Sequence, residues 1–229
     1  MSSAASDERD GTRRWLPRLM LVADGFASGR AELDAETIRA RVAALVAAGV
    51  PWVSLRDHGA SERAFEAHAT ALADAVRALR PDVVLTVHGR LGAAREIGAG
   101  LHVGRRGASL ETALAAGLAG PVGVSAHSAT AMLRAAKAGA DYATLSPVFE
   151  TRSHPDALPI GIDPLALAAE RVPIPVLALG GMTPPRAKIA RLVGAHGAAV
   201  ASALLFAWDE ARTVRQFLDA VGEGLRDQG

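Results

Sequence analysis

The chain has 229 residues, half of them hydrophobic, with a formal charge of +1 and no cysteine. The near-neutral charge gives no general bias toward nucleic acid or an acidic membrane surface. The lack of cysteine excludes disulfides, thiol nucleophiles and cysteine–zinc sites, and no apolar run approaches the ~20 residues that a membrane helix needs.

The first 14 residues are polar and mixed in charge, which predicts a disordered tail rather than a signal peptide. No linker-like stretch divides the rest, so we expect one domain over residues 15–229. The lack of cysteine fits a reducing cytosol, so we expect a cytoplasmic protein, and the sequence leaves open whether it forms a homo-oligomer.

Short apolar runs alternate with helical patterns along this domain. The runs predict strands over 18–24, 52–56, 83–88, 101–104, 122–127, 142–148, 175–179 and 198–205. Asp34, Ser61, Ser128 and Thr183 predict helix N-caps between them. Eight strands in this alternation predict an α/β fold, a single-domain TIM (β/α)8 barrel, with an open doubly wound sheet as the competing architecture.

The last two units contain glycine-rich or small-residue turns. Gly180-Gly181 follows the seventh strand and precedes a helix with Ile189, Leu192 and Val193 on one side, which we expect to face the core. Backbone N–H groups at such turns approach anions closely, and the loops after the last two strands are the usual phosphate site of a TIM barrel. The alternative is that the glycines form only a tight turn.

The carboxyl ends of barrel strands line the active site. In this chain they are rich in arginine, histidine, serine and glycine and poor in carboxylates, which predicts an anionic ligand. His127 follows the fifth strand and suits proton transfer near neutral pH, although a structural histidine is the alternative. Arg56 ends the second strand and requires an anion or a carboxylate; its neighbour Asp57 faces the other way, which favours a ligand. No histidine or carboxylate set has metal-ligand spacing, so we expect no metal site.

Seven motifs follow one another along the domain: VSLRD at 53–57, VHGR at 87–90, GLHVG at 100–104, GVSAHS at 123–128, GADYATLSPVFET at 139–151, IPVLALGGMTP at 174–184 and GAHGAAVASALL at 194–205. In this order they resemble the thiamine-phosphate-synthase and TenI-type thiazole tautomerase superfamily of small TIM barrels. The resemblance covers nearly all of residues 19–218.

The resemblance implies one of two activities. The synthase joins a pyrimidine diphosphate to a thiazole phosphate with magnesium. Its pattern has glutamine and lysine where this chain has Ser54 and His58, an Asn-Asp pair at His88-Gly89, and a second aspartate near Gly107. Glycine offers magnesium no oxygen ligand from a side chain, so the synthase activity is not the expected one.

The tautomerase branch resembles this chain in Gly89-Arg90 and in residues 148–151 and 180–184. Its reaction moves a proton on a carboxylated thiazole phosphate and needs neither a metal nor a cofactor. The resemblance implies that His127 carries the proton, that Gly180, Gly181, Ala201 and Ser202 bind phosphate, and that Ser54, Arg56, His88, Ser125 and Thr151 contact the substrate. We therefore expect a TenI-like thiazole tautomerase of thiamine biosynthesis acting on a small phosphorylated thiazole. A thiamine phosphate synthase and a non-catalytic phosphate-binding barrel are the alternatives.

Overall fold

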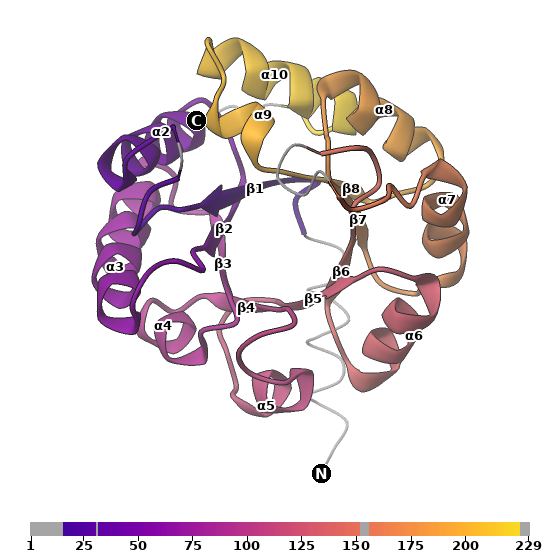
Figure 1. Cartoon of the computed structure of the whole chain (residues 1–229), viewed down its shortest axis with the longest axis horizontal. Coiled ribbons are helices and arrows are strands. Elements are labelled where there is room, and N and C mark those ends of the chain that lie inside the picture. The colour runs from indigo at the N-terminus through magenta and orange to yellow at the C-terminus, as the bar shows by residue number, and fades with distance from the viewer. Residues whose placement is uncertain (1–15, 31, 152–155, 225–229) are drawn as a thin grey trace.

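The computed structural model describes residues 16–30, 32–151 and 156–224. The tail predicted over 1–14 lies outside the described residues. Eight parallel strands pair in chain order, and β8 pairs with β1, so that the sheet closes into a barrel surrounded by helices (Figure 1). The predicted TIM barrel is confirmed, and the open sheet is excluded.

The strands are short and the helices between them vary in length. The strands are β1 (Leu19–Asp24), β2 (Trp52–Arg56), β3 (Val84–His88), β4 (Gly100–Val103), β5 (Val122–Ala126), β6 (Tyr142–Leu145), β7 (Val176–Leu179) and β8 (Gly197–Val200). The helices are α2 (Ala35–Ala47), α3 (Glu62–Leu79), α4 (Leu91–Glu96), α5 (Leu110–Ala115), α6 (Ala129–Ala138), α7 (Ile162–Arg171), α8 (Pro184–Leu192), α9 (Ser202–Leu205) and α10 (Glu210–Val221).

The predicted helix starts are confirmed by their hydrogen bonds. Asp34, Ser61, Ser128 and Thr183 each accept a hydrogen bond from the backbone N–H three residues later. This bond satisfies one of the N–H groups that a helix start leaves without an intrahelical acceptor. The caps therefore fix where the chain turns from each loop into its helix.

Two details of the last units differ from the prediction. The helix α8 buries Ala187 and Ala190, whereas Ile189 is 43% and Leu192 is 77% exposed, so the predicted core face is wrong for these two residues. Val193, the third residue of that face, is partly buried and packs against the core. Alanine side chains let this helix lie close to its neighbours, and a larger residue would hold it away. The eighth strand stops at Val200 instead of continuing to residue 205, because the chain turns at Ala201 (φ −110°, ψ −86°) into α9.

Apolar side chains fill two regions, one between the strands and the helices and one inside the barrel. The inner region contains Met20, Trp52 and Tyr142, whose two aromatic rings meet edge to face with centroids 4.6 Å apart. Leu16, just before β1, packs with them and closes the end of the barrel where the strands begin. The opposite end, where the strands finish, holds the polar side chains.

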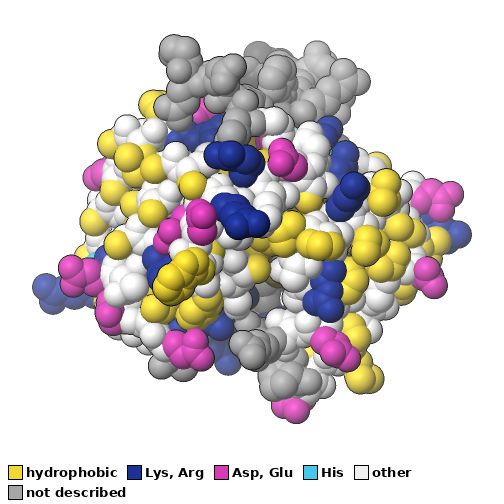
Figure 2. Space-filling model, turned by 90° about the horizontal axis from the view of Figure 1, so that it is seen from above, with side chains coloured by type: hydrophobic (Ala, Val, Ile, Leu, Met, Phe, Trp, Pro, Cys, Tyr) yellow, Lys and Arg dark blue, Asp and Glu magenta, His cyan; other side chains and the backbone are white. Residues whose placement is uncertain are grey.

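On the face shown in Figure 2, basic, acidic and apolar side chains are interspersed rather than gathered by type. None of the helices in the described part of the chain has the length and apolar character that crossing a bilayer requires.

Candidate active site

The arginine at the end of β2 is paired with a carboxylate of the neighbouring strand. Arg56 donates from Nε to Oδ1 of Asp24 at 3.0 Å and from Nη2 to Oδ2 at 2.9 Å. Arg30, from the loop after β1, donates to the same Oδ2 at 2.9 Å. Asp24 and Arg56 are register partners, so their side chains share one face of the sheet. Of the two partners expected for Arg56, an anionic ligand or a carboxylate, the structure shows the carboxylate of Asp24, so Arg56 has a protein partner before any ligand binds.

Asp57 faces away from the mouth and holds two loops together. Its Oδ2 accepts hydrogen bonds from the N–H groups of Ala27 and Ser28 at 2.9 and 2.8 Å. Its Oδ1 accepts from the Ser28 hydroxyl at 2.7 Å and from the N–H groups of Gly59 and Ala60 at 3.0 and 2.9 Å. Burial opposes ionisation, but these hydrogen bonds outweigh it and lower the pKa of the Asp57 carboxyl. Asp57 thus has a structural task at the base of the β1 and β2 loops.

His127 is exposed between the end of β5 and the Ser128 cap of α6. Its Nδ1 lies 2.6 Å from the backbone carbonyl oxygen of Ser146, which follows β6. A carbonyl oxygen only accepts hydrogen bonds, so we assign the proton to Nδ1. In the neutral ring Nε2 then carries a lone pair, which is the atom that a general base requires.

The segment that holds His127 also packs on the glycine turn after β7. A Cβ atom on Gly180 would lie 2.7 Å from Cα of Pro147, and one on Gly181 would lie 2.1 Å from the carbonyl oxygen of Glu150. Both glycines have positive φ, +100° and +62°. Only glycine therefore fits this turn. Residues 146–150 contact both His127 and the Gly180-Gly181 turn, so the structure brings the predicted proton carrier and half of the predicted phosphate site onto one short segment.

The other half of the predicted phosphate site lies on the adjacent strand. Ala201 and Ser202 follow β8, which pairs with β7, and Ser202 opens the short helix α9. The first N–H groups of a helix have no intrahelical acceptor and are available to an anion. Arg186 donates to the Gly181 carbonyl oxygen at 2.6 Å, and its guanidinium lies 4.7 Å from the Phe149 ring centroid. Phosphate binding at these turns stays a prediction that this arrangement suits.

The turns after β3 and β4 contact each other through two glycines. Gly89 and Gly107 have φ values of +68° and +91°, and the Ala108 N–H donates to the Gly89 carbonyl oxygen at 3.2 Å. A Cβ atom on Gly107 would lie 2.1 Å from that oxygen, and one on Gly89 would lie 2.8 Å from the Arg106 carbonyl oxygen. Neither position accommodates a side chain in this backbone. These are the positions at which the resemblance places the aspartates of the synthase.

The residues present at those turns do not fit a magnesium ion. Glycine has no side-chain oxygen, and magnesium in proteins is bound through carboxylates. Within residues 16–30, 32–151 and 156–224, no three histidine, aspartate or glutamate side chains converge to form a cation site. We therefore derive no step through a metal ion.

Ser54 lies inside the barrel rather than at its mouth. It is fully buried, like Trp52 and Thr86. Trp52 Nε1 donates to Thr86 Oγ1 at 3.2 Å, and the Thr86 hydroxyl donates to Ser54 Oγ at 2.9 Å. Ser54 precedes Arg56 by two residues and so occupies the inward position below it. The structure thus gives the Ser54 side chain no access to a ligand at the mouth, contrary to the prediction.

His88 and His102 stack with ring centroids 4.4 Å apart, near the carboxyl ends of β3 and β4. His88 is partly exposed, but its Nε2 is buried and has no hydrogen-bond partner among the described residues. Burial, followed by electrostatic interaction with His102 and then with Arg56, lowers the pKa of His88 well below its ordinary value. Burial and then Arg56 lower the pKa of His102 to about 3. Both rings are therefore neutral near pH 7, and contact between His88 and the substrate stays a prediction.

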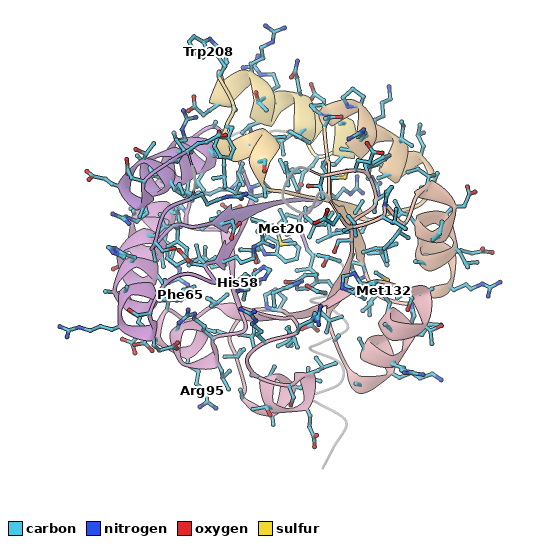
Figure 3. The ribbon with its side chains drawn as sticks, in the orientation of Figure 1. Met20, His58, Phe65, Arg95, Met132 and Trp208 are labelled. Carbon is cyan, nitrogen blue, oxygen red and sulfur yellow. The ribbon has the colours of Figure 1, made fainter. Side chains whose placement is uncertain are left out.

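Two further residues border this region. His58 lies inside the ring of strands in the view of Figure 3, as does Met20, whereas Arg95 and Trp208 point outward. Burial and then the charge of Arg56 lower the pKa of His58. His58 lies two residues after the end of β2, and this position is the sequence signal that marks it as a residue of the mouth. Thr151 is half-buried just after residues 146–150, and its contact with substrate is untested.

Comparison with known proteins identifies the family. The family model described as thiamine monophosphate synthase matches residues 26–204. The chain is 37% identical over 204 residues to a thiamine-phosphate synthase of Chloroflexus aurantiacus, covering 87% of this chain and 90% of that protein. It is 36% identical to a thiamine-phosphate synthase of Syntrophomonas wolfei, covering 83% of this chain and 93% of the relative.

Solved structures agree with this match. A thiamine phosphate pyrophosphorylase from Pyrococcus furiosus superposes with a TM-score of 0.76 at 26% identity, covering 90% of this chain and 95% of that one. A 3-hexulose-6-phosphate synthase superposes with a TM-score of 0.63 at 17% identity, which shows the shared barrel fold alone. A family model covers most of the domain, and relatives of this identity are matched over at least 90% of their length, so the chain belongs to the thiamine monophosphate synthase family.

Proposed function

We propose that this chain is a thiazole tautomerase of the TenI type, an enzyme of thiamine biosynthesis that moves one proton on a carboxylated thiazole phosphate without a metal. The observation that supports it most directly is the position of His127. Its Nδ1 is held by the Ser146 carbonyl oxygen, and residues 146–150 continue onto the glycine turn after β7.

The reaction needs one group that both accepts and returns a proton. With Nδ1–H engaged by Ser146, Nε2 of His127 accepts a proton from a ring carbon of the substrate, and the electron pair of that C–H bond enters the ring. The imidazolium then returns the proton to the other end of the rearranged π system, so that the substrate is isomerised and no electron is gained or lost. An imidazole, with an ordinary pKa of about 6.5, suits both half-steps, and such catalysis contributes about 10²- to 10⁴-fold.

The rest of the mouth supplies binding. We infer that the N–H groups of the turns at Gly180-Gly181 and Ala201-Ser202 hold the phosphate. The guanidinium of Arg56 lies near the β2 end, where it is paired with Asp24, and the imidazole of His58, whose pKa is lowered by burial and by Arg56, offers a neutral hydrogen-bonding group beside it. The carboxylates of Asp24 and Asp57, which end or follow β1 and β2, are both committed to protein partners, which favours an anionic substrate.

A thiamine phosphate synthase is the second candidate, and the relatives favour it. The named relatives with 36–37% identity over most of this chain are thiamine-phosphate synthases. Against it stands the contact of Gly89 with Gly107, which leaves no carboxylate where the family pattern places the magnesium ligands. Departure of a diphosphate develops negative charge that a cation normally stabilises.

The deciding experiment supplies purified protein with the non-aromatic thiazole carboxylate phosphate alone, and then with the aromatic thiazole phosphate and the pyrimidine diphosphate. Each reaction is run with EDTA and with magnesium, and the products are identified by mass spectrometry and NMR. We expect the aromatic tautomer in the first reaction, with EDTA present, and no diphosphate release in the second. Magnesium-dependent formation of thiamine phosphate would establish the synthase instead, and binding without turnover in either reaction would indicate a non-catalytic barrel.

A further inference from the structure

Three side chains from successive inner positions of β4, β5 and β6 form an unbroken hydrogen-bonded chain. The Tyr142 hydroxyl lies 2.9 Å from His102 Nδ1, and His102 Nε2 lies 2.8 Å from Ser125 Oγ. Tyr142 and His102 are 0% and 1% exposed, whereas Ser125 is partly exposed. The chain therefore leads from the packed interior to the mouth of the barrel, and it ends two residues before His127.

The packing around this chain leaves little freedom for its members. Gly123 lies opposite Tyr142 in the β5–β6 register, and a Cβ atom there would lie 2.1 Å from the tyrosine ring. The missing side chain lets the ring lie flat along β5 and reach His102. On its other side His102 stacks on His88 at 4.4 Å. The imidazole can thus exchange protons between its nitrogens, but its ring has no room to turn away.

His102 is neutral, because burial and the nearby Arg56 oppose a positive charge on its ring. A neutral imidazole has one N–H and one lone pair, so only two arrangements of the chain exist. Either Tyr142 donates to Nδ1 and Nε2–H donates to Ser125, or both bonds are reversed. Burial raises the pKa of Tyr142, so the phenol keeps its proton in both.

The two arrangements differ in strength. A phenol is a better donor than an imidazole N–H, and an imidazole nitrogen is a better acceptor than a phenol oxygen. When Tyr142 donates to His102 and His102 donates to Ser125, the bond between Tyr142 and His102 combines the better donor with the better acceptor. The two bonds then run in the same direction and polarise one another. In this order the Ser125 oxygen is occupied by Nε2–H, so its own hydroxyl hydrogen is free to point out of the barrel.

We propose that Tyr142 and His102 are positioning residues that fix Ser125 as a hydrogen-bond donor to an acceptor oxygen of the substrate beside His127. The relay does not depend on which reaction the barrel catalyses, but its effect on a carboxylated or phosphorylated thiazole rests on the proposed function. In this proposal Ser125 contacts the ligand, and the buried residues Tyr142 and His102 set the direction in which the hydroxyl hydrogen of Ser125 points.

The first test is the tautomer of His102 in the full-length protein, read from long-range ¹⁵N–¹H correlation spectra. We expect an unprotonated Nδ1 and a protonated Nε2, and a mixture of the two tautomers in Tyr142→Phe. Thr144→Val is the matched control. Thr144 is the register partner of Ser125, is 1% exposed, and its hydroxyl has no partner among the described residues, so its loss should leave the tautomer unchanged. An Nδ1–H tautomer in the wild type, or no change in Tyr142→Phe, would overturn the relay.

The second test is the affinity for thiazole phosphate, measured by calorimetry, with inorganic phosphate as a parallel probe. The variant Ser125→Ala loses the hydrogen bond to the acceptor oxygen of the ligand. If that oxygen is charged, the ligand that carries it should bind about 10- to 100-fold more weakly. Tyr142→Phe should weaken it several-fold, but it should have no further effect in the Ser125→Ala background, because it acts only through Ser125. Additive losses would show that Tyr142 is merely structural. If the wild type binds no thiazole phosphate, the proposed function fails while the tautomer measurement still decides the relay.

Discussion

Replacing Gly107 with aspartate tests whether the turn after β4 can carry the carboxylate that a magnesium site would require. In the present backbone the new Cβ would lie 2.1 Å from the Gly89 carbonyl oxygen, at a φ of +91°. A positive φ costs a non-glycine residue about 1–2 kcal/mol. Separating the two turns adds about 1–3 kcal/mol, the usual range for overpacking. We therefore expect Gly107→Asp to lower the free energy of unfolding by about 2–5 kcal/mol.

Variants at two other glycines allow the cost of a positive φ and the cost of overpacking to be measured separately. Gly117 has a φ of +62° and no atom within 4 Å of the position of a Cβ, so Gly117→Asp carries only the backbone cost. Gly104 has no atom within 4 Å either, and its φ is not positive, so Gly104→Asp should change stability by less than about 0.5 kcal/mol. The order of losses should be Gly107, then Gly117, then Gly104.

The assay is urea unfolding followed by circular dichroism, with EDTA or with magnesium at millimolar concentration. A cation that binds only the folded state stabilises it by about 2.7 kcal/mol at a concentration 100 times its Kd. We expect no magnesium-dependent gain for Gly107→Asp, because the new carboxylate has no second one beside it at Gly89. If Gly107→Asp were as stable as the wild type and became more stable when magnesium is added, the conclusion that Gly107 packs too closely on Gly89 to carry a magnesium ligand would be wrong.

Three further predictions concern other parts of the barrel. His127→Asn should lower turnover of the non-aromatic thiazole about 10²- to 10⁴-fold while the binding of thiazole phosphate changes only a few-fold, measured by product NMR and calorimetry; unchanged turnover would remove His127 from the mechanism. Asp57→Asn should destabilise the fold by about 1–3 kcal/mol at neutral pH. Because the folded pKa of Asp57 lies below the ordinary value of 3.8, this difference should be full above about pH 4 and shrink as pH falls through the folded pKa; a constant difference down to pH 2 would contradict it. Ala190→Leu should cost about 1–3 kcal/mol in α8, whereas Leu192→Ser, at a residue 77% exposed, should cost less than about 0.5 kcal/mol by the same unfolding measurement.

The sequence predicts those features that depend on neighbouring residues. The caps at Asp34, Ser61 and Ser128 follow from a side-chain oxygen three residues before a free N–H, so composition and spacing suffice to find them. The buried face of α2, with Ile38 and Val42, follows from the helical period in the same way. These local rules also give the strand order, because short βα units leave few ways to close a parallel sheet.

Features that depend on contacts between residues far apart in the sequence cannot be predicted from these local rules. In α8 the apolar period selects Ile189 and Leu192, but the residues that the helix buries are Ala187 and Ala190. Alternation within β2 shows that Arg56 points inward, but the register that sets it opposite Asp24 is a property of the closed sheet. The hydrogen bonds of His102 to Tyr142 and Ser125 likewise depend on how β4, β5 and β6 are staggered in the closed sheet.

The partners of the charged side chains at the mouth decide which groups there can bind a substrate or move a proton. Asp24 is bound by Arg56 and Arg30, and Asp57 is saturated by hydrogen bonds from two loops. In the part of the chain that the structure describes, neither carboxylate is free to ligate a cation or to act as a base at the strand ends. An anionic substrate must then be met by N–H groups and cations, and a proton must be moved by a neutral group. His127 has such a group in Nε2, whereas burial keeps His88 and His102 from taking a charge. If His102 instead proved to be protonated near pH 7, this division of tasks between the buried and the exposed imidazoles would be wrong.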